Sequence, residues 1–466
     1  MPTICFIIKV ILKFYRSRTE KTNLNEKSQV KQQIVLPSEC MQKIFKYTIQ
    51  NSNKKTLFKL LFVNKYWSEN VIPILWNNPF KDLIPPSMSR HTQSRDPTNC
   101  YNLLRTYLSC LDNDDYYLLF SKLNPSSHPF DMEIPNSFKP LYNYPNYLKE
   151  LSYSDLENTI YTSFMINSKH HEFQKQEKYQ VFLIASSLYK LFLQNSTQLR
   201  FLLFNNSLTT CDNNNLLDIP DIKRYNNITI KPALSNITKF QFKDIKIRTK
   251  NILLLLNSIS IYSTKINHLE FKFDSEDYNN DLVQSISDII KSQKQIFEFN
   301  ISNLKGNYSE SIFLSLYSHH KPTLFSLKLQ NIHFTRLTLS ILPNLINLKN
   351  LYLYNCNGFN NRGGINNDFR NFNLKKLQIF SENDNDDETR NLLLQLLKQS
   401  GSSLKQLGID LVCNKENIDI ILNYCPNIIV LFIMNNDLLE WKEKFNYHSK
   451  KVFIKNLNIK RRGIYI

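Results

Sequence analysis

Cysteine and histidine are the residues here that could bind a metal, form disulfides or supply a nucleophile, and their spacing offers little chemistry. The chain has 466 residues, with 8 cysteines and 9 histidines. The cysteines stand at positions 5, 40, 100, 110, 211, 356, 413 and 425. No two form a CxxC pair, and none has a histidine nearby at zinc-finger spacing. We expect no metal site, no disulfide framework, and thiols that stay reduced as in the cytosol or nucleus.

The remaining chemically suggestive residues have plainer interpretations. Adjacent histidines at 170–171 and 319–320 have side chains that diverge on either a helix or a strand, so we favour loop residues over metal ligands. The acidic run at 384–388 could bind a cation, but we favour a solvated loop. Only 7 glycines occur, and the pair at 363–364 builds no phosphate-binding loop. The sequence therefore predicts no catalytic residue, no cofactor and no enzymatic activity of its own.

The composition favours a folded chain with an excess of positive charge. Hydrophobic residues make up 42% of the sequence, which is enough for extensive burial. The length suits an elongated array or several domains better than one compact core. A total of 58 Lys and Arg against 40 Asp and Glu gives a formal net charge of +18. The positive residues are scattered, so we treat this charge as a background property that only weakly favours acidic partners.

An aromatic-rich stretch, VNKYWSENVIPILWNNPF at 63–80, carries two of the 3 tryptophans. Before it, LPSECMQKIFKYTI at 36–49 has a proline near the expected start of a helix and apolar residues at helical spacing. After a polar break, TLFKLLFVNKYW at 56–67 predicts a second helix, and Pro73 predicts the start of a short third one. Three short helices bury little surface alone, so we expect this unit to share an apolar face with a partner.

These segments resemble an F-box motif. The family pattern is a Leu-Pro-x-Glu opening, an isoleucine one to two turns later, and a leucine-rich helix ending in Val-x-x-x-Trp. The matching positions are Leu36, Pro37, Glu39, Ile44, Leu57, Leu60, Val63 and Trp67. One departure is Asn64, where the family more often has cysteine or serine.

The resemblance implies that this module binds the Skp adaptor, which in turn joins a cullin ubiquitin ligase. All eight motif residues are candidate adaptor-binding residues. The resemblance implies direct partner contacts for Leu36, Pro37, Ile44, Leu57 and Leu60. It implies for Trp67 a position shared between the core of the module and the interface. The alternative is that these residues form only the core of an ordinary helical cap.

The body of the chain repeats an apolar-x-x-apolar-x-apolar pattern. The copies begin at 148, 199, 237, 266, 296, 324, 348, 374, 404 and 428. From Phe240 onward the fourth position recurs in steps of 29, 30, 28, 24, 26, 30 and 24 residues. This is close to the period of leucine-rich repeats, and Cys356 falls at their Asn/Cys position. Segments 281–293, 388–401 and 414–427 have helical periodicity between the strands.

The predicted fold is therefore an α/β solenoid, a leucine-rich-repeat horseshoe with one strand and one helix per repeat, preceded by the three-helix module. An F-box followed by leucine-rich repeats is a known family architecture. We expect an N-terminal extension at 1–33, the F-box at 34–80, a helical linker at 81–147, and the solenoid with its C-terminal cap at 148–466. The extension is either poorly ordered or an amphipathic helix, and no segment is long enough to span a membrane. The basic tail at 450–462 is either a capping strand or a nuclear signal.

The recognition surface of such a solenoid is expected on the concave sheet face. The strand register predicts outward-facing side chains at Gln241, Asn300 and Gln378, and candidate substrate-binding residues at Glu270, Lys272, Lys328, Gln330, Tyr352, Tyr354 and Phe432. Tyrosine is a frequent interface anchor, so contact is expected near the two tyrosines. The alternative is that these residues only solvate the sheet.

The sequence thus favours a non-catalytic substrate receptor of a Skp–cullin–F-box ubiquitin ligase, located in the cytoplasm, the nucleus or both. Such a receptor acts by holding a substrate lysine near the conjugating enzyme. Two alternatives remain open, namely a scaffold unrelated to degradation and a basic solenoid that binds nucleic acid.

Overall fold

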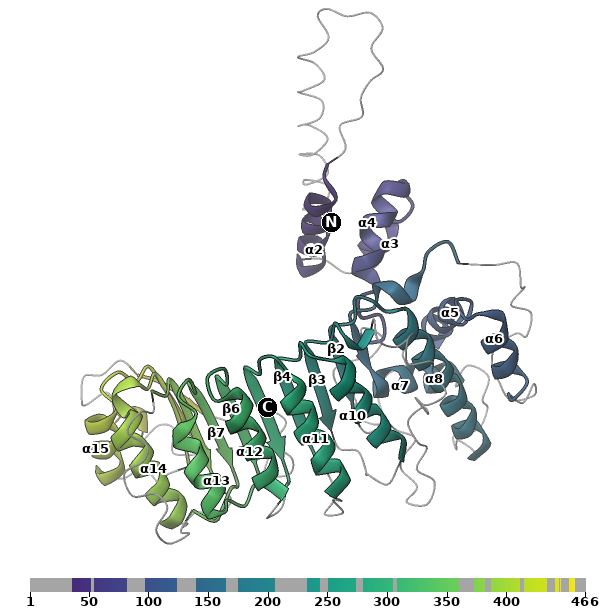
Figure 1. The fold of residues 1–466 in the computed structure, drawn as a ribbon. Coiled ribbons are helices and arrows are strands. Elements are labelled where there is room, and N and C mark those ends of the chain that lie inside the picture. The colour runs from purple at the N-terminus through teal and green to yellow at the C-terminus, as the bar shows by residue number, and fades with distance from the viewer. Residues whose placement is uncertain are drawn as a thin grey trace, which may run out of the picture. The chain divides into compact units, whose positions relative to one another are not determined.

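The structure of the protein is a computed structural model that divides into two compact units, Met1–Pro79 and Phe80–Ile466. It describes residues 36–51, 54–81, 97–123, 140–164, 175–205, 233–243, 250–273, 280–304, 308–359, 373–381, 387–410, 415–433, 441–443, 445 and 452–456. The expected extension at 1–33, the pairs at 170–171 and 363–364, and most of the acidic run lie outside the described residues. Figure 1 shows the ribbon of the chain, and each unit is described by itself.

The described residues of the N-terminal unit form three helices, α2 (Ser38–Asn51), α3 (Lys54–Leu60) and α4 (Lys65–Leu75). Their apolar faces meet in one cluster of buried side chains: Met41, Phe45, Leu57, Leu60, Val71, Ile74 and Leu75. The indole of Trp67 packs against this cluster, with its ring centroid 5.5 Å from that of Phe45. The aromatic crowding seen in the sequence therefore supplies much of the packing of a very small core.

The helix boundaries differ from the predicted ones at one place. The expected helix at 56–67 is broken by a turn at 61–63, and α4 begins at Lys65 and continues through Pro73. The cause is Asn64, whose side chain accepts a hydrogen bond from the backbone N–H of Trp67 at 2.9 Å and caps α4. The prediction that Pro73 starts a third helix is therefore wrong.

Polar contacts tie the start of α2 to α4. The hydroxyl of Tyr66 donates to the carbonyl of Leu36, and the hydroxyl of Ser38 donates to the side-chain oxygen of Asn70. Asn70 itself donates to the carbonyl of Tyr66 at 2.8 Å and is 3% exposed. The Leu-Pro opening is thus held against α4 by a satisfied buried network.

The second unit contains a single parallel sheet of eleven strands in sequential order. The strands are β1 (Glu150–Ser152), β2 (Phe201–Phe204), β3 (Lys239–Lys243), β4 (His268–Lys272), β5 (Glu298–Ser302), β6 (Ser326–Gln330), β7 (Asn350–Tyr354), β8 (Lys376–Phe380), β9 (Gln406–Ile409), β10 (Val430–Ile433) and β11 (Phe453–Asn456). Each of the ten predicted repeat motifs overlaps one of the first ten strands. The prediction of an α/β repeat with a parallel sheet is confirmed.

Two described helices of this unit precede β1, and the others lie between strands along the chain. The helices are α5 (Pro97–Leu108), α6 (Asn113–Phe120), α7 (Tyr153–Phe164), α8 (Lys175–Asn195), α10 (Lys250–Tyr262), α11 (Asn280–Ser292), α12 (Tyr308–His320), α13 (Arg336–Ile341), α14 (Asp387–Ser400) and α15 (Lys415–Tyr424). Short 3₁₀ turns span Tyr144–Tyr147, Leu342–Asn344 and Gly401–Ser403. Parallel neighbours in sequential order need right-handed crossovers, which place the helices between strands on one face of the sheet. Figure 1 shows α10, α11 and α12 as one layer over their strands.

The core lies between the sheet and this helical layer. The second and fourth positions of the strands are buried, as the strand period of two requires. An aromatic ladder crosses four strands, with centroid distances of 6.4 Å from Phe204 to Phe240, 6.0 Å from Phe240 to Phe271, and 6.2 Å from Phe271 to Phe299. Successive repeats are therefore joined by ring contacts as well as by backbone hydrogen bonds.

Buried polar side chains also join each repeat to the one before it. The Ser263 hydroxyl donates to the Leu234 carbonyl at 2.8 Å, 29 residues earlier. His320 Nε2 lies 2.7 Å from the Ile290 carbonyl, and the Ser403 hydroxyl donates to the Leu374 carbonyl at 2.6 Å. These bonds satisfy carbonyls that would otherwise be buried without partners. Each one matches the repeat period that the apolar pattern gives.

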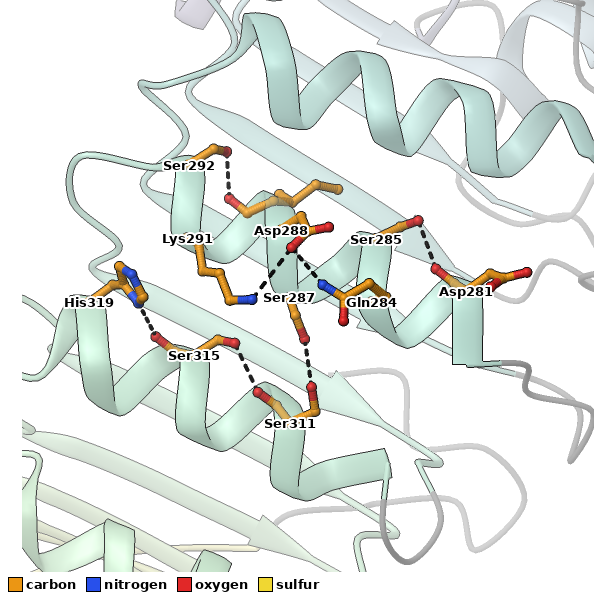
Figure 2. A network of polar contacts seen from close by, with 11 residues as sticks. Asp281, Gln284, Ser285, Ser287, Asp288, Lys291, Ser292, Ser311, Ser315 and His319 are labelled. Atoms are coloured by element: carbon orange, nitrogen blue, oxygen red, sulfur yellow. Dashed lines mark hydrogen bonds and ion pairs between the residues drawn. The ribbon is translucent and has the colours of Figure 1, made fainter.

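The helical layer has its own polar contacts, seen from close by in Figure 2. The hydroxyls of Ser287 on α11 and Ser311 on α12 lie 3.2 Å apart across the helix–helix interface. Asp288 accepts from Gln284 at 2.8 Å and lies 3.5 Å from the ammonium of Lys291, both within α11. The serine pair links the two helices, as does the bond from His320 to the Ile290 carbonyl, and the carboxylate contacts follow the surface of one helix. We interpret this network as packing and helix surface rather than as a binding site.

Three asparagines end successive strands in the left-handed backbone region. Asn303, Asn331 and Asn355 have φ values of 60°, 52° and 49° and follow β5, β6 and β7. Their backbone N–H groups donate to Gln330, Tyr354 and Phe380 of the next strand at 2.8 Å in each case. Asparagine tolerates this conformation better than other non-glycine residues. It therefore turns the chain away from each strand at the same place.

Acidification is expected to destabilise the repeat body through His320. Burial, the largest cause, together with the nearby His319, holds the pKa of His320 below its ordinary value, although the bond to the Ile290 carbonyl opposes the shift. The unfolded chain therefore takes up a proton as the pH falls through about 6.5, while the folded state resists it. Stability is thus fully present above that pH and declines below it. His320→Asn is expected to make the free energy of unfolding less dependent on pH when urea unfolding is measured from pH 7.5 to 5. His319→Asn, at an exposed position, should leave the decline in stability unchanged. Equal pH profiles for the two variants would contradict the role given to His320.

Candidate functional site

The eight motif residues of the N-terminal unit occupy different depths. Pro37, Glu39 and Val63 are exposed, and Leu36, Ile44 and Trp67 are half-buried at the edge of the core. Leu57 and Leu60 are 0% and 9% exposed. The structure therefore offers six of these residues to a partner. It places the two leucines of α3 inside the unit, where their contribution is to packing rather than to direct contact.

Sequence reasoning missed two exposed phenylalanines of this unit, Phe58 and Phe62, which lie near the predicted motif residue Val63. Phe58, Phe62 and Val63 are 46%, 88% and 52% exposed, and they lie at the end of α3 and in the turn that follows. We call these three residues the turn surface. The signal was present as the uninterrupted run LLFV at 60–63, which has more apolar residues than one helix face can bury. Adjacent exposed apolar residues of this size indicate a protein interaction site.

Asn64 is expected to be a stabilising cap at the edge of the turn surface. Asn64→Ala removes the acceptor for the Trp67 N–H and is expected to lower the free energy of unfolding of the N-terminal unit by about 1 kcal/mol. Asn64→Ser keeps a capping oxygen and is expected to change it by only a few tenths of that amount. Hydrogen exchange of the amides of α4 measures both effects. Equal exchange in the two variants would show that the cap contributes nothing.

The second candidate surface is the face of the sheet opposite the helices. It is formed by the first, third and fifth residues of β3 to β7, and we call it the ladder face. Its charged members are four lysines, two glutamates and one histidine: Lys239, Lys243, Lys272, Lys328, Glu270, Glu298 and His268. Neighbouring strands are about 4.8 Å apart, so these side chains form continuous rows.

Glu270 lies at the centre of one ion cluster. The ammonium of Lys243 is 2.9 Å from its carboxylate, and the side-chain amide of Gln241 donates to the same group. The register pairs Gln241 with Glu270, and Lys243 with Lys272. Glu270 is thus positioned by its neighbours and already carries two partners.

A second pair lies one row earlier on the same face. His268 Nδ1 lies 2.5 Å from Glu298 Oε2. Burial is the largest cause that lowers the pKa of His268, and Lys239 adds to it, while Glu298 and Glu270 oppose it. The imidazole is therefore neutral at neutral pH and donates to Glu298 as a hydrogen-bonded neighbour. Lys239 extends over the ring of Phe201, with its ammonium 4.8 Å from the centroid.

Lys328 lies at the third position of β6, between Asn300 and Tyr352 in the register. Its ammonium is 5.3 Å from the centroid of the Tyr354 ring. Burial is the main cause that lowers the pKa of Lys328, and Lys243 and Lys272 add to it, while Glu270 opposes it. The Lys328 side chain is half-buried. Its ammonium lies near the aromatic ring of Tyr354 and is repelled by the positive charges of Lys243 and Lys272.

Two residues expected to project from this face are buried instead. Tyr354 is 1% exposed and Gln330 is 9% exposed. The Tyr354 ring stacks on Phe380 with centroids 5.5 Å apart, and its hydroxyl donates to Gln378 at 2.6 Å. Both residues occupy the fifth position of a strand, where side chains pack against neighbours at the strand end. Tyr354 is therefore part of the packing beneath the ladder face and not an exposed member of it.

Gly408 makes room for this aromatic packing. A Cβ atom at this residue would lie 2.8 Å from Cγ of Gln378 and 2.9 Å from Cζ of Phe380. Both contacts are shorter than packed atoms allow, so the strand approaches its neighbour closely only because it lacks a side chain here. Phe432 pairs with Gly408 in the register and lies three strands beyond Tyr352. The structure thus brings Glu270, Lys272, Lys328 and Tyr352 together and leaves Phe432 apart.

The described residues include histidines, acidic side chains and five free cysteines. Among them no group of three or more His, Cys, Asp and Glu side chains is arranged to hold a metal ion. The five described cysteines are free thiols, and burial raises the pKa of Cys356 and of Cys110 to about 12. A thiol with such a pKa is a poor nucleophile at neutral pH. Across the described segments, none of the helices has the length and apolar character needed to cross a membrane.

Comparison of the sequence with protein-family models and with curated proteins gives no match.

Proposed function

We propose that the chain is the substrate-recognition subunit of a Skp–cullin–F-box ubiquitin ligase. In this proposal the N-terminal unit is an F-box that docks the Skp adaptor, and the repeat body is a leucine-rich-repeat horseshoe that binds the protein to be ubiquitinated. The single observation that supports it best is the N-terminal unit, a three-helix fold that buries its motif leucines and exposes Phe62 at 88%. Apolar surface on so small a unit suits a permanent partner.

The proposed adaptor contact combines the turn surface with the Leu-Pro opening of α2. The network from Leu36 to Tyr66 fixes the opening, so little conformational freedom is lost when a partner docks on it. Phe58, Phe62 and Val63 would supply the apolar area. Large aromatic side chains that leave water on binding are typical of residues that dominate binding energy.

The repeat body would hold the substrate on the ladder face. That face carries polar, charged and aromatic side chains on a parallel sheet. The chain then acts by position alone, since it raises the effective concentration of a substrate lysine near the charged conjugating enzyme.

The experiment follows proteins captured by the full chain in cells of its own source. We expect a set of captured proteins whose half-lives lengthen when cullin activity is blocked. The same proteins should remain bound to a Leu36→Ala/Pro37→Ala variant but no longer be degraded through it. Capture without any cullin-dependent change in half-life would instead favour the scaffold.

Nucleic-acid binding is the second candidate, favoured by the net charge of +18. It predicts retention on DNA or RNA that falls steeply as the salt concentration rises. Glu270 and Glu298 interrupt the lysine rows of the ladder face, which argues against a continuous phosphate-binding track there. Retention that survives physiological salt and depends on ladder-face lysines would support this candidate over the receptor.

A further inference from the structure

The ammonium of Lys328 lies near the centre of the ladder face without a counter-ion of its own. Its contact there is with the ring face of Tyr354 at 5.3 Å. Within the described segments, no hydrogen bond or ion pair reaches this ammonium. Water-exclusion around a half-buried charge costs free energy unless an opposite charge compensates it. The position therefore suits a group that arrives with a negative charge.

The acidic group that attracts Lys328 is the carboxylate of Glu270, and this carboxylate already has other partners. It accepts from Lys243 at 2.9 Å and from Gln241, so it attracts Lys328 only at longer range. Lys243 and Lys272 act on Lys328 in the opposite sense, because like charges repel. Because Glu270 is shared in this way, Lys328 is left without an ion pair within the described segments.

We propose that Lys328 binds a side-chain carboxylate of an acidic segment in the protein captured on the ladder face. This inference rests on the proposed function, in which that face holds the substrate. The bound carboxylate forms an ion pair with Lys328 and excludes the remaining water from the ammonium, with Tyr354 beneath it. A charge-assisted bond in such a setting is stronger than one at an open surface.

The surroundings of Lys328 favour a single carboxylate over a continuous polyanion. Glu270 and Glu298 lie on the same face, two strands and one strand away from β6 in the sheet order. A phosphate backbone laid across these rows would bring its charges against both glutamates. An Asp or Glu side chain of a peptide reaches Lys328 alone, and the neighbouring Asn300 and Tyr352 can accept or donate hydrogen bonds to the peptide.

The test uses the full chain and a fluorescein-labelled peptide of alternating glutamate and serine, with binding followed by fluorescence polarisation. Three further probes are a peptide with glutamine in place of glutamate, one with phosphoserine, and a single-stranded DNA. Lys328→Gln is compared with Lys294→Gln, a matched loss of charge at an exposed lysine between α11 and β5. Thermal unfolding of each variant establishes that it is folded.

We expect the glutamate peptide to bind and the glutamine peptide not to bind. Lys328→Gln should weaken the glutamate complex by about tenfold or more, and Lys294→Gln by less than about twofold. Equal losses in the two variants, or equal binding of the glutamate and glutamine peptides, would overturn the proposal. Binding of only the phosphoserine peptide or only the DNA through Lys328 would also overturn it. No adaptor is present in this assay, so its outcome is separate from that of adaptor binding.

Discussion

Phe271→Ala is expected to lower the free energy of unfolding of the repeat body by about 3–5 kcal/mol, one of the two largest effects that we predict. The ring is fully buried and lies in the middle of the aromatic ladder, 6.0 Å from Phe240 and 6.2 Å from Phe299. Its removal leaves a cavity and also breaks two ring contacts between successive repeats. Because each repeat contacts chiefly its neighbours, the loss should appear first as easier local opening of β3 to β5.

Two controls separate packing from a general loss of aromatic surface. Phe271→Leu keeps most of the volume and should cost less than about 1.5 kcal/mol. Phe297→Ala removes an equal side chain that is 43% exposed in the next repeat and should change stability by about 0.5 kcal/mol or less. Urea unfolding together with hydrogen exchange measures all three. A loss for Phe297→Ala as large as that for Phe271→Ala would contradict the assigned core.

Gln293→Leu is expected to lower the free energy of unfolding by about 2–4 kcal/mol, although leucine is the more hydrophobic residue. The buried amide oxygen of Gln293 accepts from the Ile266 N–H at 2.9 Å. Its nitrogen donates to the carbonyls of Ser263 at 2.8 Å and Ile289 at 3.0 Å. Leucine would remove the partners of the Ile266 N–H and the Ser263 carbonyl where α10 meets β4, whereas the Ile289 carbonyl keeps its bond from the Ser292 hydroxyl.

The matched control is Gln284→Leu on the exposed surface of α11. Gln284 bonds only to Asp288 in the same helix, so its replacement should change stability by about 0.5 kcal/mol or less. Hydrogen exchange of the Ile266 amide reports the effect directly, because that amide loses its acceptor only in the Gln293 variant. Unchanged exchange of this amide would show that Gln293 does not hold the two repeats together.

The sheet could be predicted because every strand repeats the same local signal. Two inward apolar residues, such as Leu269 and Phe271, alternate with polar ones, and this period of two recurs at nearly constant spacing along the chain. Register follows from the same pattern, since a slip of one residue would expose the whole apolar set. Glu270, Lys328 and Tyr352 were therefore placed correctly on one face, at the third position of their strands.

What the sequence did not reveal depends on contacts between repeats. The burial of Tyr354 requires Phe380 on the next strand and the missing side chain of Gly408 on the strand after it. Gln293 looked like one polar residue at a helix end, although it bonds to backbone groups of the preceding repeat. The sequence shows an asparagine directly after each of β5, β6 and β7. The left-handed backbone conformation of these asparagines is evident only from the structure.

In the N-terminal unit, too, some features follow from the sequence pattern and others depend on the folded structure. Apolar spacing predicted α2 and the helical character of the segments that follow it, but not that the third helix begins at Lys65. The turn at 61–63 could not be predicted in this way. The apolar spacing favours a continuous helix, but the side chain of Asn64 caps a new helix, α4, at this place. The exposed Phe62 followed from that turn, so Phe58 and Phe62 of the turn surface were missed, whereas Val63 was already predicted as a motif residue.

The measurement that tests the central claim most directly is isothermal titration of the purified full chain with the purified Skp adaptor of the same source. We expect one-to-one binding that Leu36→Ala/Pro37→Ala and Phe62→Ser each weaken by about tenfold or more. Ile261→Ser, which replaces a 59% exposed apolar residue on the repeat body, should leave the affinity unchanged. Absence of binding by the folded wild-type chain, or an equal loss in the Ile261 variant, would contradict the claim that the N-terminal unit is an adaptor-docking F-box.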